Sequence, residues 1–265
     1  MSENEENKTE MYGPNAELYD AWIDCYDPNH IELLAIQKQV SLFGKKILDI
    51  GCGTGRFFFN VLPIAGSVIG VDPDQKAIKR LRKKLEKTPA ELKSKALTIN
   101  KPIEECTPQD LGSVDVAVFS WSFYALDQEQ LLRTARLLRD VLQRDGSVVI
   151  LQPVGGVFEE KIMRRFFDSN EGMEEYERAI TNLNNILPWF FNRITLERIS
   201  SEFCTSDLHF LTEALQMFAS TEGGKEDTSD ITEEAVLEVS SPYRDNTGVF
   251  KFSDEVDMYV LKKRG

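Results

Sequence analysis

Three glycines at alternate positions form the part of this sequence with the strongest capacity for ligand chemistry. Gly51, Gly53 and Gly55 follow a short apolar run, Ile47–Ile50, and precede a second apolar run, Phe57–Leu62. This spacing predicts a strand, a tight turn and a helix, which is the geometry that points backbone N–H groups at a ligand. Glycine suits such a turn because a residue without Cβ lets a ligand approach the main chain.

A carboxylate at the end of the next apolar run extends this candidate site. Ser67–Val71 predicts a second strand, and Asp72 follows it, about twenty residues after Gly51. A carboxylate at the tip of a neighbouring strand can accept hydrogen bonds from both hydroxyls of a ribose. The two motifs together therefore predict a site for a nucleoside-containing ligand.

The pattern Asp49-x-Gly51-x-Gly53-x-Gly55, followed by Asp72, resembles the S-adenosylmethionine site of class I (Rossmann-like) methyltransferases. The alternative is the dinucleotide fingerprint G-x-G-x-x-G/A, which has Gly or Ala at the position that Arg56 occupies here. A bulky side chain there would obstruct the close packing of helix on strand that the last glycine of the fingerprint permits. The motif therefore favours the methyltransferase resemblance.

The resemblance implies an α/β fold built on a Rossmann-like, seven-stranded and mostly parallel sheet. The expected strand order is 3-2-1-4-5-7-6, with strand seven antiparallel and helices on both faces. We expect a disordered tail over residues 1–14 and a single methyltransferase domain over residues 15–265. Within this domain, residues 15–43 would form a helical cap and residues 155–191 a helical lid inserted after strand five. A dimer surface or a passive helical cap is the alternative for residues 155–191.

The cofactor implied by the resemblance is S-adenosyl-L-methionine, with S-adenosyl-L-homocysteine as its product, and no metal is expected. By the same resemblance, Asp49 would order the glycine turn and reach the ammonium group of the ligand, while Asp72 would hold the ribose. Tyr19 would cap the methionine end of the ligand, and an aromatic side chain packed on the sheet is the alternative. The residues expected to bind the cofactor are Tyr19, Asp49, Gly51, Cys52, Gly53, Gly55, Asp72, Pro73, Ile103 and Ser120.

Aromatic residues follow the fourth expected strand, Val114–Ser120, at the end of the sheet where ligands bind in open α/β folds. His30 and Tyr124 are candidates for a catalytic role, but no general base can be singled out from the sequence. A surface position is the alternative for His30, even though the pKa of an ordinary histidine suits acid–base work. The expected acceptor pocket, some of whose members could instead be core residues, is lined by Trp121, Phe123, Tyr124 and Trp189.

Composition narrows the choice of partners. A formal net charge of −13 over 265 residues argues against a nucleic-acid partner, which would favour a basic face. The four cysteines are scattered without a C-x-x-C pair, which is typical of reduced cytoplasmic thiols and not of a zinc site or a disulfide framework. No apolar stretch is long enough to span a bilayer. We expect a cytoplasmic protein without a membrane partner, either a monomer or a homodimer.

The function that these expectations favour is methyl transfer from S-adenosyl-L-methionine to a small-molecule or short-peptide acceptor. The reaction would be an in-line displacement, in which the protein mainly aligns the reactants and excludes water. Two alternatives remain at this point. One is an oxidoreductase with a nucleotide cofactor, and the other is a partner protein that binds S-adenosylmethionine without catalysing transfer.

Overall fold

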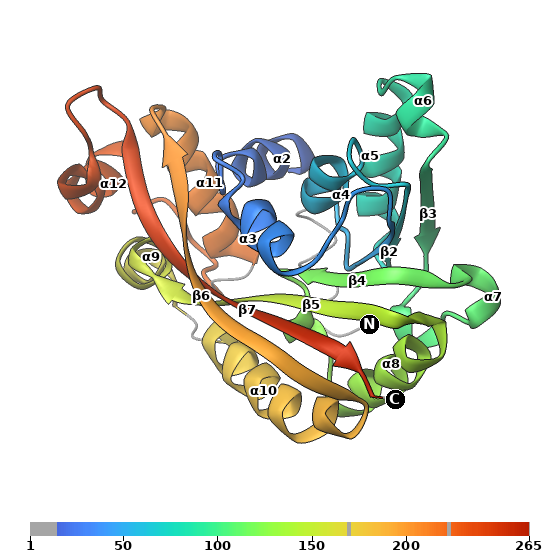
Figure 1. The fold of residues 1–265 in the computed structure, drawn as a ribbon. Coiled ribbons are helices and arrows are strands. Elements are labelled where there is room, and N and C mark those ends of the chain that lie inside the picture. Colours follow the sequence, from blue (N-terminus) through green and yellow to red (C-terminus); the bar gives the residue numbers. More distant parts are fainter. Residues whose placement is uncertain (1–14, 169–170, 222–223, 265) are drawn as a thin grey trace. The chain divides into compact units, whose positions relative to one another are not determined.

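The computed structural model describes residues 15–168, 171–221 and 224–264, and the expected N-terminal tail, residues 1–14, lies outside them. A seven-stranded sheet has the order β3-β2-β1-β4-β5-β7-β6 (Figure 1), which confirms the predicted order. Strand β7 runs antiparallel to β5 and β6, as expected. The strands are β1 (Lys46–Ile50), β2 (Ser67–Asp72), β3 (Ala96–Asn100), β4 (Val114–Ser120), β5 (Leu142–Gly156), β6 (Phe191–Thr205) and β7 (Phe250–Lys263).

Helices connect the strands. The α-helices within the described chain are α2 (Ala16–Asp24), α3 (Ile31–Gln39), α4 (Arg56–Val61), α5 (Gln75–Glu86), α6 (Ala90–Lys93), α7 (Pro108–Leu111), α8 (Gln128–Val141), α9 (Arg164–Phe166), α10 (Glu171–Ile186), α11 (Leu208–Thr221) and α12 (Glu233–Ser240). Short 3-10 turns are η1 (Ile103–Glu105), η2 (Phe123–Ala125), η4 (Leu187–Trp189) and η5 (Ser241–Tyr243), and η3 (Phe158–Met163) is a π-helix.

The parallel register of β1 with its two neighbours brings the candidate site together. Ile50, the last residue of β1, lies opposite Val71 on β2 and Phe119 on β4. Because parallel strands end at the same edge of a sheet, the glycine turn, Asp72 and Ser120 follow one another along that edge. The register therefore places the three predicted features on the side of the sheet where ligands bind.

The described chain divides into two compact units. The larger unit contains Glu32–Pro153, Glu175–Ile199 and Asp257–Gly265, and the smaller unit contains the remaining residues, including α2, α11 and α12. The expected helical cap and the expected lid each contribute residues to both units, so neither forms a separate body. Their roles as a cap and a lid stay predictions.

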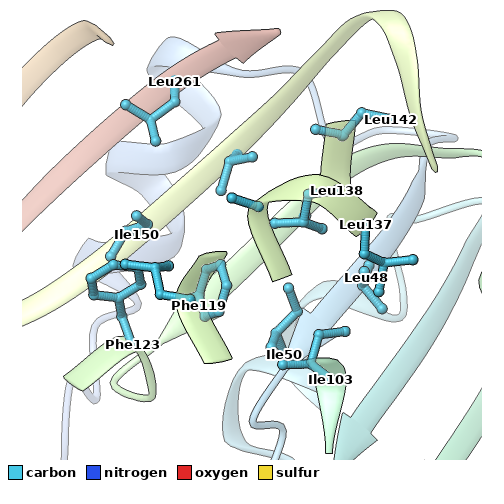
Figure 2. Close-up of a cluster of buried hydrophobic side chains, with 14 of the residues drawn as sticks. Leu48, Ile50, Ile103, Phe119, Phe123, Leu137, Leu138, Leu142, Ile150 and Leu261 are labelled. Atoms are coloured by element: carbon cyan, nitrogen blue, oxygen red, sulfur yellow. The ribbon is translucent and has the colours of Figure 1, made fainter. Parts of the chain in front are cut away.

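The core of the larger unit lies between the sheet and α8 (Figure 2). Leu48 and Ile50 on β1 and Phe119 on β4 are buried together with Leu137 and Leu138 of α8. The helix begins at a capping box in which the Asp127 carboxylate accepts a hydrogen bond from the Gln130 N–H at 2.8 Å. Such a cap stabilises a helix by about 1 kcal/mol. Packing and capping thus fix the helix that follows β4.

The opposite face of the sheet in the larger unit is covered by α4. Successive side chains of a strand point to opposite faces, so Gly70 faces away from the α8 core, which Ile69 and Val71 join. The buried ring of Phe58 lies beside Gly70. The helix that follows the glycine turn is therefore anchored directly on the strand that carries Asp72.

The core of the smaller unit is aromatic. The buried ring of Trp22 on α2 lies 4.5 Å from that of Phe203 and 4.8 Å from that of Phe218, measured between centroids. Phe158 stacks on Phe203 at 4.5 Å. Such pairs add to the stabilisation that burial alone provides. The N-terminal helix is thereby part of the core of its unit.

Strand β6 is the last strand in the order of the described sheet. Its segment in the larger unit exposes two large apolar side chains, Ile194 and Leu196, with 57% and 49% of their surface accessible. No helix among the described residues is long and apolar enough to cross a membrane. In the same part of the chain, no group of three or more His, Cys, Asp or Glu side chains could hold a metal ion.

Candidate functional site

The glycine turn after β1 uses left-handed backbone conformations. Gly51, Gly53 and Gly55 have φ angles of 68°, 52° and 103°. A Cβ on Gly51 would lie 2.4 Å from Ser122 Cβ, and one on Gly55 would lie 2.7 Å from the ring of Phe59. A Cβ on Gly53 would meet no described atom within 4 Å. The centre of the turn therefore leaves open space over the main chain, as a ligand cradle requires.

The Asp72 carboxylate is in contact with this turn. Its Oδ2 accepts a hydrogen bond from the Gly53 N–H at 2.8 Å, and its Oδ1 accepts one from the Asp74 N–H at 2.9 Å. A carboxylate oxygen can accept more than one hydrogen bond, so these two contacts do not by themselves exclude ribose hydroxyls. The structure thus brings the predicted ribose-binding residue to the predicted turn.

Asp49, two residues before the turn, is a buried carboxylate. Among the described residues, neither of its oxygens has a hydrogen-bond partner of normal geometry, and the Phe58 N–H lowers its pKa. Burial, and then the negative charge of Asp72, raises the pKa of Asp49 to about 8, against the opposing charge of Arg56. A buried carboxylate with unused acceptors fits a ligand that brings a cationic, hydrogen-bonding group.

The chain leaves β4 through a strained residue. Trp121 has a φ of 60°, which a bulky side chain rarely adopts, and its N–H donates to the Leu151 carbonyl at 3.1 Å. The hydroxyl of the next residue, Ser122, donates to the Ile50 carbonyl. These contacts tie the end of β4 to β5 and to the end of β1. Strained residues of this kind persist where surrounding contacts hold them, often at functional sites.

A buried ionic network connects α3 to the site. Arg56 Nη2 donates to Glu32 Oε2 and to Ser120 Oγ, both at 2.9 Å. The Trp121 indole N–H donates to the other Glu32 oxygen at 2.9 Å, and the guanidinium carbon of Arg56 lies 5.5 Å from the centroid of the Trp121 ring. Sequence reasoning missed Glu32. An acidic residue in the first turn of a helix is common, so its position alone carried no signal.

The other predicted cofactor residues of the larger unit differ in exposure. The Ile103 side chain is buried in the core beside α8, so only its main chain is available to a ligand. Cys52 is buried, and burial raises the pKa of its thiol well above the usual range, which makes a thiolate role unfavourable. Pro73 continues the chain after Asp72 and is exposed. Their contacts to a cofactor stay predictions.

Tyr19 and His30 both belong to the smaller unit. The ring of Tyr19 lies 6.3 Å from that of Phe218 and packs against the aromatic core there. His30 is exposed in the loop before α3, with a φ of 54°. The capping role of Tyr19 and the catalytic role of His30 stay predictions.

The predicted acceptor pocket requires a correction. Phe123 is 1% exposed and meets Phe119 edge-on at 5.4 Å in the core, so its side chain does not line an open pocket (Figure 2). Tyr124 is half-buried with its ring 4.9 Å from that of Tyr176 on α10. Trp189 lines a separate open depression of about 380 Å³ with five residues of α8, α10 and the following turn, namely Gln128, Leu132, Asn185, Ile186 and Phe190. No predicted cofactor residue lines that depression. Aromatic composition alone did not distinguish the core from a pocket.

Sheet order, glycine turn and β2 carboxylate together define a class of protein. Residues 47–146 match the methyltransferase domain family. This matched segment and the sheet order 3-2-1-4-5-7-6 make the chain similar to the class I (Rossmann-like) S-adenosylmethionine-dependent methyltransferases. The match covers β1 to the beginning of β5, which includes the glycine turn and Asp72.

Curated relatives match part of the chain. Over 103 residues, the chain is 31% identical to a protein of Saccharomyces cerevisiae named as a probable S-adenosylmethionine-dependent methyltransferase. This alignment covers 39% of the chain and 34% of the relative, and a match to an uncharacterized Haemophilus influenzae protein covers 43% of that relative. The chain therefore spans less than half the length of these relatives.

Solved structures share the fold at low sequence identity. The MccD protein aligns with a TM-score of 0.58 and 13% identity over 91% of this chain and 100% of its own. The N-methyltransferase NodS of Bradyrhizobium japonicum, solved with S-adenosyl-L-homocysteine, aligns with a TM-score of 0.51 and 12% identity over 90% of this chain and 87% of its own. These likenesses show the fold.

Proposed function

We propose that this protein transfers a methyl group from S-adenosyl-L-methionine to a small-molecule or short-peptide acceptor. The observation that carries the proposal is the contact between the open glycine turn and the carboxylate at the tip of β2, through Gly53 and Asp72. A dinucleotide cofactor is disfavoured because Arg56 follows the third glycine and is held by Glu32 and Ser120. The family match over residues 47–146 supports the same cofactor.

Each part of the turn has a distinct proposed role. The sulfonium cofactor supplies an activated methyl group, so binding, alignment and exclusion of water are the main tasks of the protein. The main chain at Gly53 accommodates the cofactor closely, Asp72 accepts hydrogen bonds from the ribose hydroxyls, and Asp49 neutralises the ammonium group. Asp49 must lose its proton to do so, because burial favours its neutral form in the free protein.

The class of acceptor is inferred from charge. Relatives matching parts of this chain are named as a tRNA U34 carboxymethyltransferase and as a probable protein arginine N-methyltransferase. The net charge of −13 disfavours a phosphate-backbone acceptor for this chain. A small molecule or a short peptide is therefore the proposed acceptor, and Tyr124 and His30 stay the candidates for orienting it or moving a proton.

Calorimetric titration tests the cofactor. We expect S-adenosyl-L-methionine and S-adenosyl-L-homocysteine to bind the wild-type protein, and a nicotinamide dinucleotide not to bind. Gly53→Val should block binding of both because its side chain would fill the open space of the turn, and circular dichroism would verify that the variant is folded. Binding of the dinucleotide alone would contradict the proposal.

Transfer of a radiolabelled methyl group to a panel of amines, phenols, thiols and short peptides tests the activity. Gly53→Val serves as the binding-deficient control. Labelling of an acceptor by the wild-type protein alone would support the proposal. Tight cofactor binding without transfer to any acceptor in the panel would instead favour the partner protein that binds the cofactor without catalysis.

A further inference from the structure

We propose that Glu32 is a positioning residue of the cofactor site. Its buried carboxylate holds the Arg56 guanidinium and the Trp121 indole in fixed orientations at the edge of the sheet where the methyl group is transferred. The inference rests on the proposed function, because it assigns a role within that same site. It concerns a residue of α3, outside the matched segment 47–146.

The geometry shows one carboxylate that orients two side chains. One Glu32 oxygen accepts from Arg56 and the other accepts from the indole of Trp121, each at 2.9 Å. The Glu32 side chain is 4% exposed and that of Arg56 is 17% exposed, so water competes little for these bonds. Hydrogen bonds between ionised groups are stronger and more directional than neutral ones. Glu32 can therefore fix both partners at once.

Both partners of Glu32 adjoin the proposed cofactor. Arg56 directly follows the glycine turn and also donates to Ser120 Oγ, at the end of β4. Trp121 follows Ser120 and has a left-handed backbone conformation, which is unusual at the end of a strand. The indole hydrogen bond to Glu32 and the guanidinium over the ring help to hold this conformation. Loss of Glu32 would free the side chains of Arg56 and Trp121 without altering the glycine turn.

Glu32→Gln is the sharpest substitution because it keeps the size and an acceptor for the indole while removing the charge that Arg56 needs. The probe is S-adenosyl-L-homocysteine in calorimetric titration. We expect Glu32→Gln to weaken its binding about tenfold, which is the usual scale for one charge-assisted hydrogen bond. Glu129→Gln is the matched control, because Glu129 forms an exposed ion pair with Arg133 on α8 of the same unit, and its binding should be unchanged.

A double-variant cycle separates positioning from a general structural role. If Glu32→Gln acts through Arg56, the variant that combines Glu32→Gln with Arg56→Gln should bind no more weakly than the weaker of the two single variants. Additive losses would overturn the proposal, because they would show that the charge of Glu32 acts independently of Arg56. A lowered melting temperature with unchanged affinity would also overturn it, because the role would then be structural alone.

The experiment also covers a Glu32→Gln variant that does not fold and a wild-type protein that does not bind the probe. If Glu32→Gln does not fold, Trp121→Phe tests the same network, and wild-type affinity in that variant would overturn the proposal. If the wild-type protein itself binds no S-adenosyl-L-homocysteine, the proposed function fails and the role of Glu32 falls with it. A defect confined to Glu32→Gln therefore cannot be mistaken for failure of the proposed function.

Discussion

The Gly53 backbone N–H donates to Asp72 Oδ2 at 2.8 Å, so the centre of the turn after β1 is fixed to the tip of β2. Asp72 thus has two tasks, because it orders the turn before any ligand arrives and is available to a ribose afterwards. Preorganisation of this kind lowers the cost of binding, since the free protein already holds the bound geometry.

Asp72→Ala should weaken binding of S-adenosyl-L-methionine by roughly 10–100-fold, because it removes charge-assisted hydrogen bonds to the ribose and frees the turn. Asp72→Asn keeps one acceptor oxygen and should lose less. Calorimetric titration of the three proteins measures both effects. Equal affinities for all three would show that the ribose is held elsewhere.

Gly51→Ala and Gly53→Ala should differ in their effect on stability. Both place a Cβ on a left-handed residue, which costs about 1–2 kcal/mol. Gly51→Ala also brings its methyl group against Ser122, whose hydroxyl is bonded to the Ile50 carbonyl, and should cost about 2–4 kcal/mol in all. Urea unfolding of each variant gives the comparison, and a larger loss for Gly53→Ala would contradict the described geometry.

Asp49 should make stability depend on pH. Its pKa is raised from 3.8 to about 8 in the folded protein, so between these values the folded state binds a proton that the unfolded state has released. Its contribution is therefore present below pH 3.8 and is lost as pH rises towards 8, with a slope of at most about 1.4 kcal/mol per pH unit. Thermal unfolding of wild type and Asp49→Asn across this pH range should show that only the wild type loses this part of its stability as pH rises. Identical pH profiles of stability for the two proteins would exclude a contribution from Asp49.

Proton release gives a second readout of Asp49. An ammonium group bound beside it would favour the ionised carboxylate, so cofactor binding should release a proton near neutral pH. Titrations in two buffers with different ionisation enthalpies would detect that proton. Asp49→Asn should release fewer protons and bind the cofactor more weakly, whereas unchanged proton release would show that another group is responsible.

Cys25 and Cys204 should form a disulfide under oxidation. The Cys204 N–H donates to the Cys25 carbonyl at 2.9 Å beside the antiparallel bridge between Tyr26 and Phe203, so the two cysteines are directly opposed. Opposed residues of this kind typically have Cα atoms about 5.5 Å apart, which is within the range that a disulfide spans. Burial, then Asp24 and Cys204, raises the pKa of Cys25 to about 11, so few thiolates are present at neutral pH. Oxidised glutathione, itself reduced to two thiols, should therefore link the pair slowly and faster at higher pH. Peptide mapping without reductant would identify the link, with Cys25→Ser as the control, and no link even at alkaline pH would contradict the prediction.

The sheet and the turn could be predicted because their signals are local. Apolar runs such as Ile47–Ile50 and Ser67–Val71 end at glycines or a carboxylate, and parallel pairing then places those ends together. The whole strand order came from the family resemblance and is confirmed.

The lining of the site could not be predicted in the same way. Phe123 and Trp189 have the same aromatic character as Trp121, but one is in the core and the other is exposed beside α10, because burial depends on packing partners distant in sequence. Glu32 was missed for a related reason. Its significance comes from Arg56 and Trp121, which lie far along the chain, and no local pattern marks that association.

The position of β6 at the end of the strand order has a consequence for behaviour in concentrated solution. A terminal strand offers unpaired backbone groups to other chains, and the exposed Ile194 and Leu196 would make such pairing favourable. Charged Arg193 and Glu197 flank them. These charges oppose aggregation along the strand, so neutralising them would reduce solubility before it altered the fold.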